Sequence, residues 1–211
     1  GEVIAFTDDD CIPPHDWLTR LADGYARYPD VVGVGGFLAA PDDVLTRKPL
    51  ARYELFAART MYGVNDQEQV AGFACPAGGT NNMSYRRSIL AQVNGFDESF
   101  HYAAGEDADL KWRVCALGHS LLYLPVKMIH MQDYSWARLR RQSYARGRGR
   151  MQFERLRGRT PNRPILLGRL ARALFNLPRD VLTMPERAFS VVKFIEGAWG
   201  VRGQWDELAQ A

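Results

Sequence analysis

Short apolar runs alternate with amphipathic stretches along the amino-terminal part of the chain. Residues 3–7 are apolar and rich in β-forming side chains, which predicts a buried strand of the parallel type. Apolar residues then recur at helical spacing over residues 16–28, with Asp16 as the expected N-cap. The glycine-containing apolar run 31–37 predicts a second strand. Strands that alternate with helices in this way indicate an α/β layer fold.

The alternation continues to about residue 131. Further expected elements are helices over residues 50–61, 86–93 and 105–117, a glycine turn into a short strand over 78–85, and strand pieces at 121–124 and 126–131. Gly118 is the expected stop of the helix that begins after Gly105. The apolar side chains expected in the core of these elements are Trp17, Leu110, Trp112, Val114 and Leu117.

The chain changes character after Tyr134, where arginines crowd residues 138–159. Two helical stretches follow at about 165–176 and 186–199, separated by Pro178 and Pro185. We therefore predict two domains, residues 1–133 and a basic, amphipathic helical tail over residues 134–211. A basic amphipathic helix beside apolar helices favours contact with an anionic membrane surface, and a solvated helix face is the alternative. No RNA-binding motif is present, so no nucleic acid partner is predicted.

Composition sets only broad limits. The chain has 211 residues, a hydrophobic share of 46% and a net charge of +3, all ordinary for a folded protein. Its three cysteines, Cys11, Cys75 and Cys115, show no paired spacing, which argues against a disulfide framework and fits a reducing compartment. No apolar run is long enough for a spanning helix, and no signal peptide is visible. Because the first residue is Gly1 and the chain opens on a strand, we expect a piece of a longer protein.

An acidic triplet, Asp8-Asp9-Asp10, follows the first predicted strand. Open α/β sheets bind ligands at the carboxyl ends of their strands, and Mg²⁺ takes carboxylate oxygens together with phosphate oxygens. Asp8 and Asp10 are therefore candidates to hold a divalent metal against a diphosphate and to bind sugar or ribose hydroxyls. The alternative is a solvated acidic turn that caps the next helix.

A second acidic motif, Glu106-Asp107, opens a predicted helix. The helix macrodipole alone favours carboxylates in a first turn, and that is the simpler explanation of the motif taken alone. Asp107, however, shares a helix face with Leu110 and Val114, three and seven residues further on, and that face is expected to pack inward. A carboxylate at the top of this face is expected to point into a cleft, where it is a candidate general base. Asp109 is expected to hold the helix in place.

Two further segments carry polar groups next to predicted strands. His130 ends an apolar strand, where a histidine is more often structural, but beside a metal its neutral imidazole is a candidate ligand or diphosphate contact. Residues 78–84 offer glycines, asparagines and exposed backbone to sugar hydroxyls. A tight turn is the simpler explanation of that segment taken alone.

The motifs follow one another in an order that is more specific than any one of them. In chain order they are Phe6-Thr7-Asp8-Asp9-Asp10-Cys11-Ile12-Pro13, Gly79-Thr80-Asn81-Asn82-Met83-Ser84-Tyr85-Arg86-Arg87, Gly95-Phe96-Asp97-Glu98, Gly105-Glu106-Asp107-Ala108-Asp109-Leu110, Arg113 with Gly118, Tyr123-Leu124-Pro125, and His130. This series resembles family 2 glycosyltransferases of the GT-A fold over about residues 1–132. The resemblance implies a partial GT-A fold: α/β, Rossmann-like, with a mostly parallel sheet flanked by helices, without the family's first strands, and followed by the helical tail.

The resemblance also implies an inverting transfer of a sugar from a nucleotide-diphospho-sugar to an acceptor hydroxyl, with Mg²⁺ or Mn²⁺ as cofactor. By that analogy Asp107 is the catalytic base. The donor-binding residues are Asp8, Asp9 and Asp10, and the metal ligands are Asp10, Asp8 and His130. The acceptor-binding residues are Glu106, Gly79, Thr80, Asn81 and Asn82. The expected acceptor is a glycan or a lipid-linked molecule of the cell envelope, and the expected location is cytoplasmic, peripheral at the inner face of the plasma membrane.

Two departures from the family pattern matter. The family's amino-terminal half, with its nucleotide-base pocket, is absent from this sequence, so tight donor binding by this piece alone is not expected. Residues 142–147 lack the Gln-x-x-Arg-Trp motif of processive synthases, which favours a distributive transferase. The alternatives are a metal-independent glycoside hydrolase, with its two carboxyl groups in the roles of acid and base or nucleophile, and a membrane-associated binding module with a degenerate site.

Overall fold

The computed structural model describes residues 1–210, which form two compact units. The first unit comprises Gly1–Arg47, Glu54–Asp97 and Asp107–Gln132. The second comprises Lys48–Tyr53, Glu98–Glu106 and the described chain from Asp133 onward. The predicted domains 1–133 and 134–211 remain a prediction, because two short segments from within the predicted first domain also belong to the second unit.

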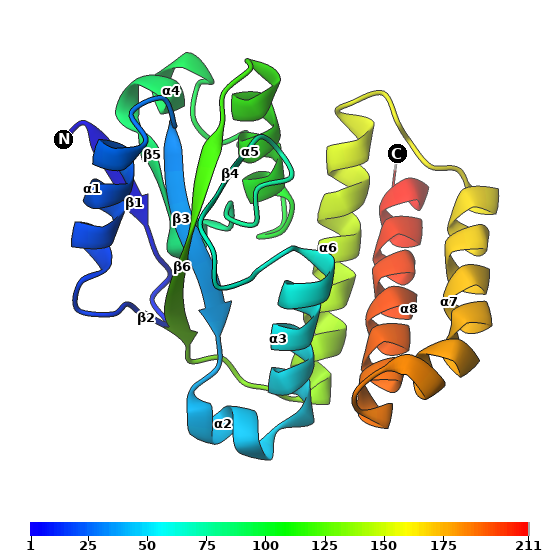
Figure 1. The fold of residues 1–211 in the computed structure, drawn as a ribbon. Helices are drawn as coiled ribbons and strands as arrows, with labels where there is room; N and C mark the ends of the chain where they lie inside the picture. Colours follow the sequence, from blue (N-terminus) through cyan, green and yellow to red (C-terminus); the bar gives the residue numbers. More distant parts are fainter. Residues whose placement is uncertain (211) are drawn as a thin grey trace. The chain divides into compact units, whose positions relative to one another are not determined.

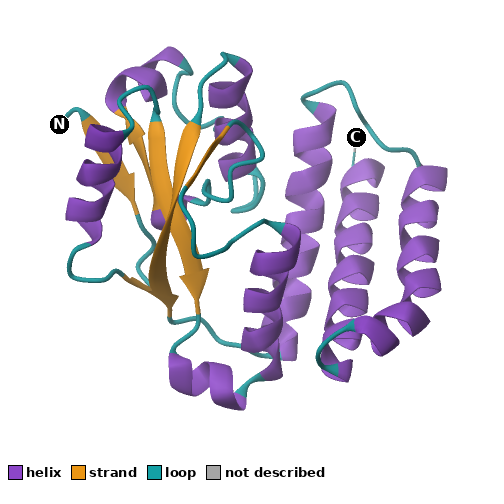
Figure 2. Ribbon diagram, in the orientation of Figure 1, coloured by secondary structure: helices purple, strands orange, loops and turns teal. Residues whose placement is uncertain are grey.

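The first unit is built on one mixed sheet (Figures 1 and 2). Its strands in spatial order are β1 (Val3–Phe6), β5 (Met83–Arg86), β3 (Gly33–Ala39), β6 (Leu121–His130) and β2 (Cys11–Ile12), and β4 (Gln69–Ala71) also pairs with β6. The register aligns Val3 with Arg86, Gly33 with Tyr85 and Gly33 with Leu121. The predicted strand pieces around Pro125 are one continuous strand, β6.

The expected mixture of strands and helices is confirmed, but the expected strand directions are wrong. β3 pairs with β6 in parallel, and the other pairings among the described residues are antiparallel. β1 was also expected to be buried, yet it lies at the end of the strand order beside β5, and its Val3 is exposed. An apolar run indicates a strand, but it does not specify which neighbour the strand pairs with or in which direction.

Alternate side chains of the central strands fill two cores, one on each face of the sheet. On one face Leu122 and Leu124 of β6 pack with Trp17 and Leu21 of α1 (Trp17–Arg27). On the other face Leu121 of β6 packs with residues from α4 (Arg87–Gln92) and α5 (Glu106–Ala116). Successive residues of a strand point to opposite faces, so the single strand β6 contributes to both cores.

The helices of the sheet unit depart from the predictions in three places. Trp112 and Leu117 are exposed, whereas Leu110 and Val114 are buried as expected. Trp112 lies two residues after Leu110 and therefore on the opposite side of α5, and Leu117 lies beyond the last helical residue. Asp16 occupies the N-cap position of α1 but makes no capping hydrogen bond, because its carboxylate binds Arg20 instead.

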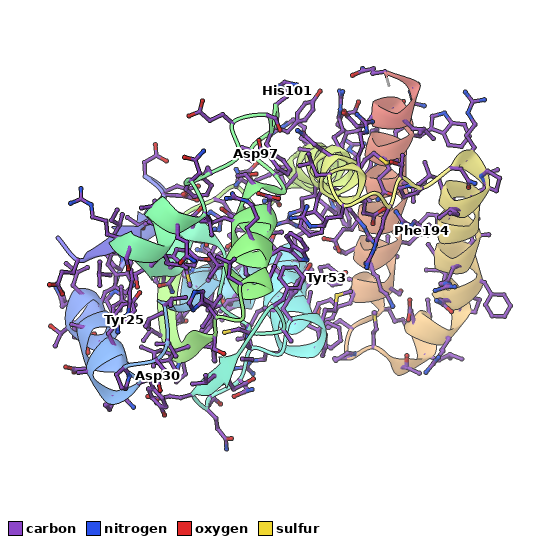
Figure 3. The ribbon with its side chains drawn as sticks, turned by 90° about the horizontal axis from the view of Figure 1, so that it is seen from above. Tyr25, Asp30, Tyr53, Asp97, His101 and Phe194 are labelled. Carbon is purple, nitrogen blue, oxygen red and sulfur yellow. The ribbon has the colours of Figure 1, made fainter. Side chains whose placement is uncertain are left out.

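Two polar contacts tie α1 to the sheet. The hydroxyl of Tyr25, which Figure 3 labels on α1, lies 3.1 Å from Ser84 Oγ of β5. The indole Nε1 of Trp17 donates to Asn82 Oδ1 at 2.9 Å.

Two further helices, α2 (Asp42–Arg47) and α3 (Pro49–Met61), follow β3 in the chain.

The second unit is dominated by three long helices, α6 (Trp136–Arg155), α7 (Arg163–Thr183) and α8 (Arg187–Ala209). α6 and α8 approach closely through glycines, since a Cβ built on Gly203 would lie 2.1 Å from Tyr144 O. The predicted break at Pro178 is wrong: α7 continues through it, and the ion pair between Asp180 and Lys193 holds the last turn against α8. None of the described helices combines the length and the apolarity that crossing a bilayer requires.

The arginine-rich segment 138–159 lies mostly in α6, and several of its guanidinium groups are paired inside the helical unit. Arg148 is buried and bonds to Glu207 of α8, Arg146 pairs with Glu196, and Arg150 pairs with Glu154 of its own helix. The contact of this segment with a membrane stays a prediction.

Candidate active site

The acidic triplet forms the turn between β1 and β2. Cys11 N donates to Asp8 O at 3.2 Å and closes this turn. Asp8 and Asp9 are exposed, and Asp10 is half-buried. The triplet follows a strand, as predicted, but it leads into the two-residue strand β2 and not directly into a helix.

Strand β2 brings Asp10 to His130. Cys11 pairs with His130 in the antiparallel register of β2 and β6, and Met131 N donates to Asp10 O at 2.8 Å. His130 Nε2 consequently lies 3.3 Å from Asp10 Oδ2. His130 is buried, so its imidazole is held within the protein at the end of β6. The structure thus joins two predicted site residues that lie far apart in the sequence.

Asp10, Cys11 and His130 each offer one ligand atom, and these three atoms lie within 4.8 Å of one another. The carboxylate oxygen and the imidazole nitrogen suit a divalent cation. The Cys11 thiol suits Mg²⁺ or Mn²⁺ less, because sulfur is a soft ligand and these cations prefer oxygen. Burial, reinforced by the charges of Asp10 and Asp8, raises the pKa of this thiol to about 11. Asp8, a predicted ligand, is not a member of this group among the described residues.

Asp107 lies in the first turn of α5, and Thr80 holds its carboxylate. Thr80 Oγ1 donates to Asp107 Oδ1 at 2.7 Å, and Thr80 N donates to Asp107 Oδ2 at 3.2 Å. Burial raises the pKa of Asp107 above its usual range, the two bonds from Thr80 lower it, and the negative charge of Asp8 raises it further. Because the charge of Asp8 acts on Asp107, the two acidic motifs belong to one electrostatic environment.

The segment 79–82 separates into two parts with different surroundings. Gly79 is exposed, and Thr80 and Asn81 are half-buried, so their groups remain near the surface beside Asp107. Asn82 is 1% exposed, accepts a hydrogen bond from Trp17 and donates to Phe37 O and Val126 O. The amide of Asn82 thus joins α1, β3 and β6, and its predicted contact with an acceptor stays a prediction.

The surroundings of α5 fix the position of Asp107. Asp109 is buried and pairs with Arg113 at 2.7 Å, and Arg113 also donates to Val93 O, which agrees with the expectation that Asp109 holds the helix.

Lys111 lies one turn after Asp107 in α5. Its ammonium group donates to Cys75 O and so holds the loop that leads to Thr80. Burial lowers the pKa of this ammonium group. Glu106, the first residue of α5, is half-buried, and its role toward an acceptor stays a prediction.

The sequence did not predict Cys11 and Lys111 as parts of this site, nor Thr80 as the partner of Asp107. Cys11 has one local signal, because it follows Asp10 directly. The bond between Thr80 and Asp107 spans 27 residues, and the bond from Lys111 to Cys75 spans 36. No local pattern reports contacts at such separations.

Comparison with known proteins finds a family model that matches the amino-terminal part of the chain. Residues 1–93 match the family model described as Glycosyl transferase family 2. This range contains the acidic triplet and the segment 79–82. The resemblance that the motif order indicated is therefore confirmed over this part of the chain.

Individual relatives match over part of their length. A protein named pre-mycofactocin glycosyltransferase, in two strains of Mycobacterium tuberculosis, is 30% identical over 131 residues, which is 61% of this chain and 26% of that protein. A Haloferax volcanii protein named glucosyl-dolichyl phosphate glucuronosyltransferase is 32% identical over 100 residues, 46% of this chain and 30% of that protein. The chain thus spans less than a third of the length of these curated relatives.

Proposed function

We propose, because residues 1–93 match the family model described as Glycosyl transferase family 2, that this chain belongs to an enzyme that transfers a sugar from a nucleotide-diphospho-sugar to an acceptor hydroxyl. The observation that carries the proposal is the pair of Asp10 and His130, whose oxygen and nitrogen lie 3.3 Å apart in the sheet unit. The same unit holds the buried carboxylate of Asp107, whose oxygens accept two hydrogen bonds from Thr80. A donor diphosphate needs a cation held by groups such as Asp10 and His130, and an acceptor hydroxyl needs a base such as Asp107 to take its proton.

Asp10 and His130 are the residues that would hold Mg²⁺ or Mn²⁺, with Asp8 and Asp9 next to the donor. A divalent cation bound there neutralises the charge that builds on a departing diphosphate. The observed donor set, one carboxylate oxygen and one imidazole nitrogen at 3.3 Å, fits such an ion. Cys11 is a neighbour of this pair and not a proposed ligand, because its sulfur is soft.

Asp107 is the proposed base that takes the proton of the acceptor hydroxyl. Each of its oxygens accepts one bond from Thr80, and a carboxylate oxygen has a second lone pair that can receive a proton. A carboxyl pKa raised by burial makes the group a stronger base than an exposed aspartate. One base on the side opposite the leaving diphosphate favours inversion at the anomeric carbon. Thr80 positions that base, and Gly79, Asn81 and Glu106 are proposed to contact the acceptor.

The names of the relatives bear on the acceptor and on the location. One relative is named for glucosyl-dolichyl phosphate, a lipid-linked sugar, and another for pre-mycofactocin. We propose a glycan or lipid-linked acceptor of the cell envelope, used in the cytoplasm at the inner face of the plasma membrane. Residues 142–147 lack the processive motif, so one sugar per encounter is the proposed mode.

The variant Asp107→Asn in the full-length protein tests the proposal. It keeps the shape of the side chain but removes the proton acceptor, so we expect transfer to fall at least about a hundredfold while donor binding stays nearly normal. Asp30→Asn is the matched control, because Asp30 is exposed in the loop after α1 (Figure 3). Radiolabelled sugar transfer and donor binding by calorimetry are the measurements.

Two outcomes would count against the assignment. Near-normal turnover by Asp107→Asn would exclude Asp107 as the base. A wild-type protein that shows no transfer with any nucleotide sugar, while its tail binds membranes, would favour the alternative of a binding module with a degenerate site.

A further inference from the structure

One side of α7 is packed and the other is open. On the packed side Leu166 is buried, Ala173 lies against Gly197 of α8, and Asp180 pairs with Lys193 of α8 at 2.9 Å. Figure 1 shows α7 alongside α8. Because these inward residues recur every seven positions or so, they define one face of the helix, and the opposite face meets solvent.

The open face is apolar. Its large exposed side chains are Ile165, Leu167, Leu174, Phe175, Val181 and Leu182. Leu167 and Leu174 are seven residues apart and form one row, with Phe175 beside it, in the part of α7 before Pro178. Val181 and Leu182 continue the exposed apolar surface in the last turns, where Figure 1 shows that α7 bends. Phe175 and Leu182 are each 85% exposed. We call these five residues the α7 stripe. A contiguous apolar stripe of this kind usually marks an interaction surface.

Positive charge borders the α7 stripe, and negative charge is missing from it. Arg172 and Arg179 are exposed and lie seven residues apart, so both stand on one flank of the stripe. The one acidic residue in the described range of α7, Asp180, is on the packed side and paired with Lys193. The exposed surface of this helix therefore combines apolar side chains with guanidinium groups.

We propose that the α7 stripe docks on an anionic lipid surface, with the helix lying in the plane of the headgroups. Phe175, Leu182 and the row beside them would enter the boundary of the acyl chains, and Arg172 and Arg179 would meet anionic headgroups at its edge. Long guanidinium side chains reach the headgroup level while their stems cover apolar surface. This surface is different from the arginine-rich segment of α6, where Arg148 and Arg146 are engaged by glutamates of α8.

A second copy of the same chain is the competing occupant, and charge argues against it. A stripe paired with itself would bring four exposed arginines together and would offer them no carboxylate, since Asp180 faces away. An anionic bilayer supplies apolar and negative groups at the same depth. The inference does not depend on the proposed sugar transfer, because it uses residues of α7 and α8 alone.

Vesicle flotation of the 211-residue chain tests the proposal. The two lipid samples are phosphatidylcholine alone and phosphatidylcholine mixed with phosphatidylglycerol. We expect binding to the mixed vesicles, much weaker binding to phosphatidylcholine alone, and a loss of binding as salt concentration rises.

Two double variants separate the apolar and the charged contributions. Phe175→Ser with Leu182→Ser should weaken binding by about tenfold for each side chain. Arg172→Gln with Arg179→Gln should weaken it by about fivefold for each arginine. All four side chains are exposed, so folding should be kept, and circular dichroism checks this.

Matched controls remove the same chemistry from other surfaces. Leu18→Ser with Met61→Ser removes exposed apolar side chains of α1 and α3, and Arg140→Gln with Arg141→Gln removes exposed arginines of α6. Both controls should bind vesicles as the wild type does. Equal loss in the controls would overturn the assignment to the α7 stripe.

Three other results would overturn the proposal. One is a wild-type chain that floats with neither lipid sample. Another is unchanged binding by the Phe175 and Leu182 double variant. The third is a lipid-free dimer, seen by analytical ultracentrifugation, that the same double variant dissociates, since the stripe would then be an interface between copies.

Discussion

At Asp107, burial and hydrogen bonding act on one carboxylate in opposite directions. Burial raises its pKa, while the two bonds from Thr80 stabilise the ionised form and lower it. Thr80, which the sequence offered only as an acceptor contact, thus acts on the proposed base through two hydrogen bonds. We therefore expect Thr80 to influence the pH range in which the protein transfers sugar.

Thr80→Val tests this balance through the pH profile. The substitution removes the hydrogen bond from the Thr80 hydroxyl, which stabilises the charged carboxylate and lowers its pKa. The effect of burial, which raises the pKa, then has less to counter it, so the pKa of Asp107 should rise. With Asp107 as the proposed base, transfer needs its carboxylate, and the acidic limb of the kcat/KM profile should therefore move upward by about one pH unit. At pH values well above the acidic limb, the kcat/KM of the variant should approach the wild-type value.

Controls for this variant come from the same chain. Thr80→Ser keeps the hydroxyl and should keep the wild-type profile. Thr60→Val removes a hydroxyl that donates to Phe56 O in α3 and should leave the profile unchanged. An unshifted acidic limb in Thr80→Val would show that Thr80 does not tune Asp107.

At the scale of elements, the pairing of β3 with β6 depends on a glycine. The register of this parallel pair shifts between Gly35 and Phe37, and a Cβ on Gly36 would lie 2.2 Å from Val126 O of β6. It would also lie 2.7 Å from Asn82 Nδ2, the amide that joins the two strands. The shift in register at Gly36 thus lets β3 lie close against β6, the strand that ends at His130.

Gly36→Ala should consequently destabilise the protein by about 2 kcal/mol or more, because the added methyl group collides with backbone and not with a flexible side chain. Gly72→Ala is the matched control, since a Cβ there meets nothing within 4 Å, and its effect should stay within about 0.5 kcal/mol. Thermal unfolding of both variants is the measurement. Equal melting temperatures for the two variants would show that β3 and β6 can separate at little cost.

At the scale of the whole molecule, the dependence on metal separates the rival enzyme classes. A family 2 transferase with Asp10 and His130 at the donor should lose transfer in EDTA and regain it with Mn²⁺ or Mg²⁺. A glycoside hydrolase that uses two carboxyl groups needs no metal. EDTA already saturated with Mg²⁺ is the control for effects of the chelator itself. Full transfer in excess EDTA would remove the proposed cation from the mechanism.

Much of the site was visible in the sequence because its parts are local patterns. An acidic triplet after an apolar run, a carboxylate pair at a helix start and a histidine at a strand end are each read from a few neighbouring residues. Their order along the chain indicated the family that residues 1–93 match. The positions of α1, α3 and α5 followed from apolar periodicity in the same way, and only their end residues and Trp112 differ.

The sequence by itself thus determined most of the longer elements, where the acidic motifs stand on them and which family the first part resembles, but not the short elements β2, β4 and α2. Only the tertiary structure decided that the sheet is mainly antiparallel, that Asn82 is a buried connector, that Thr80 binds Asp107 and that β2 brings Asp10 to His130. The physical reason is the distance along the chain over which each effect acts. Periodicity and propensity act over one or two turns, whereas strand neighbours and hydrogen-bond partners are chosen by the packing of segments many residues apart.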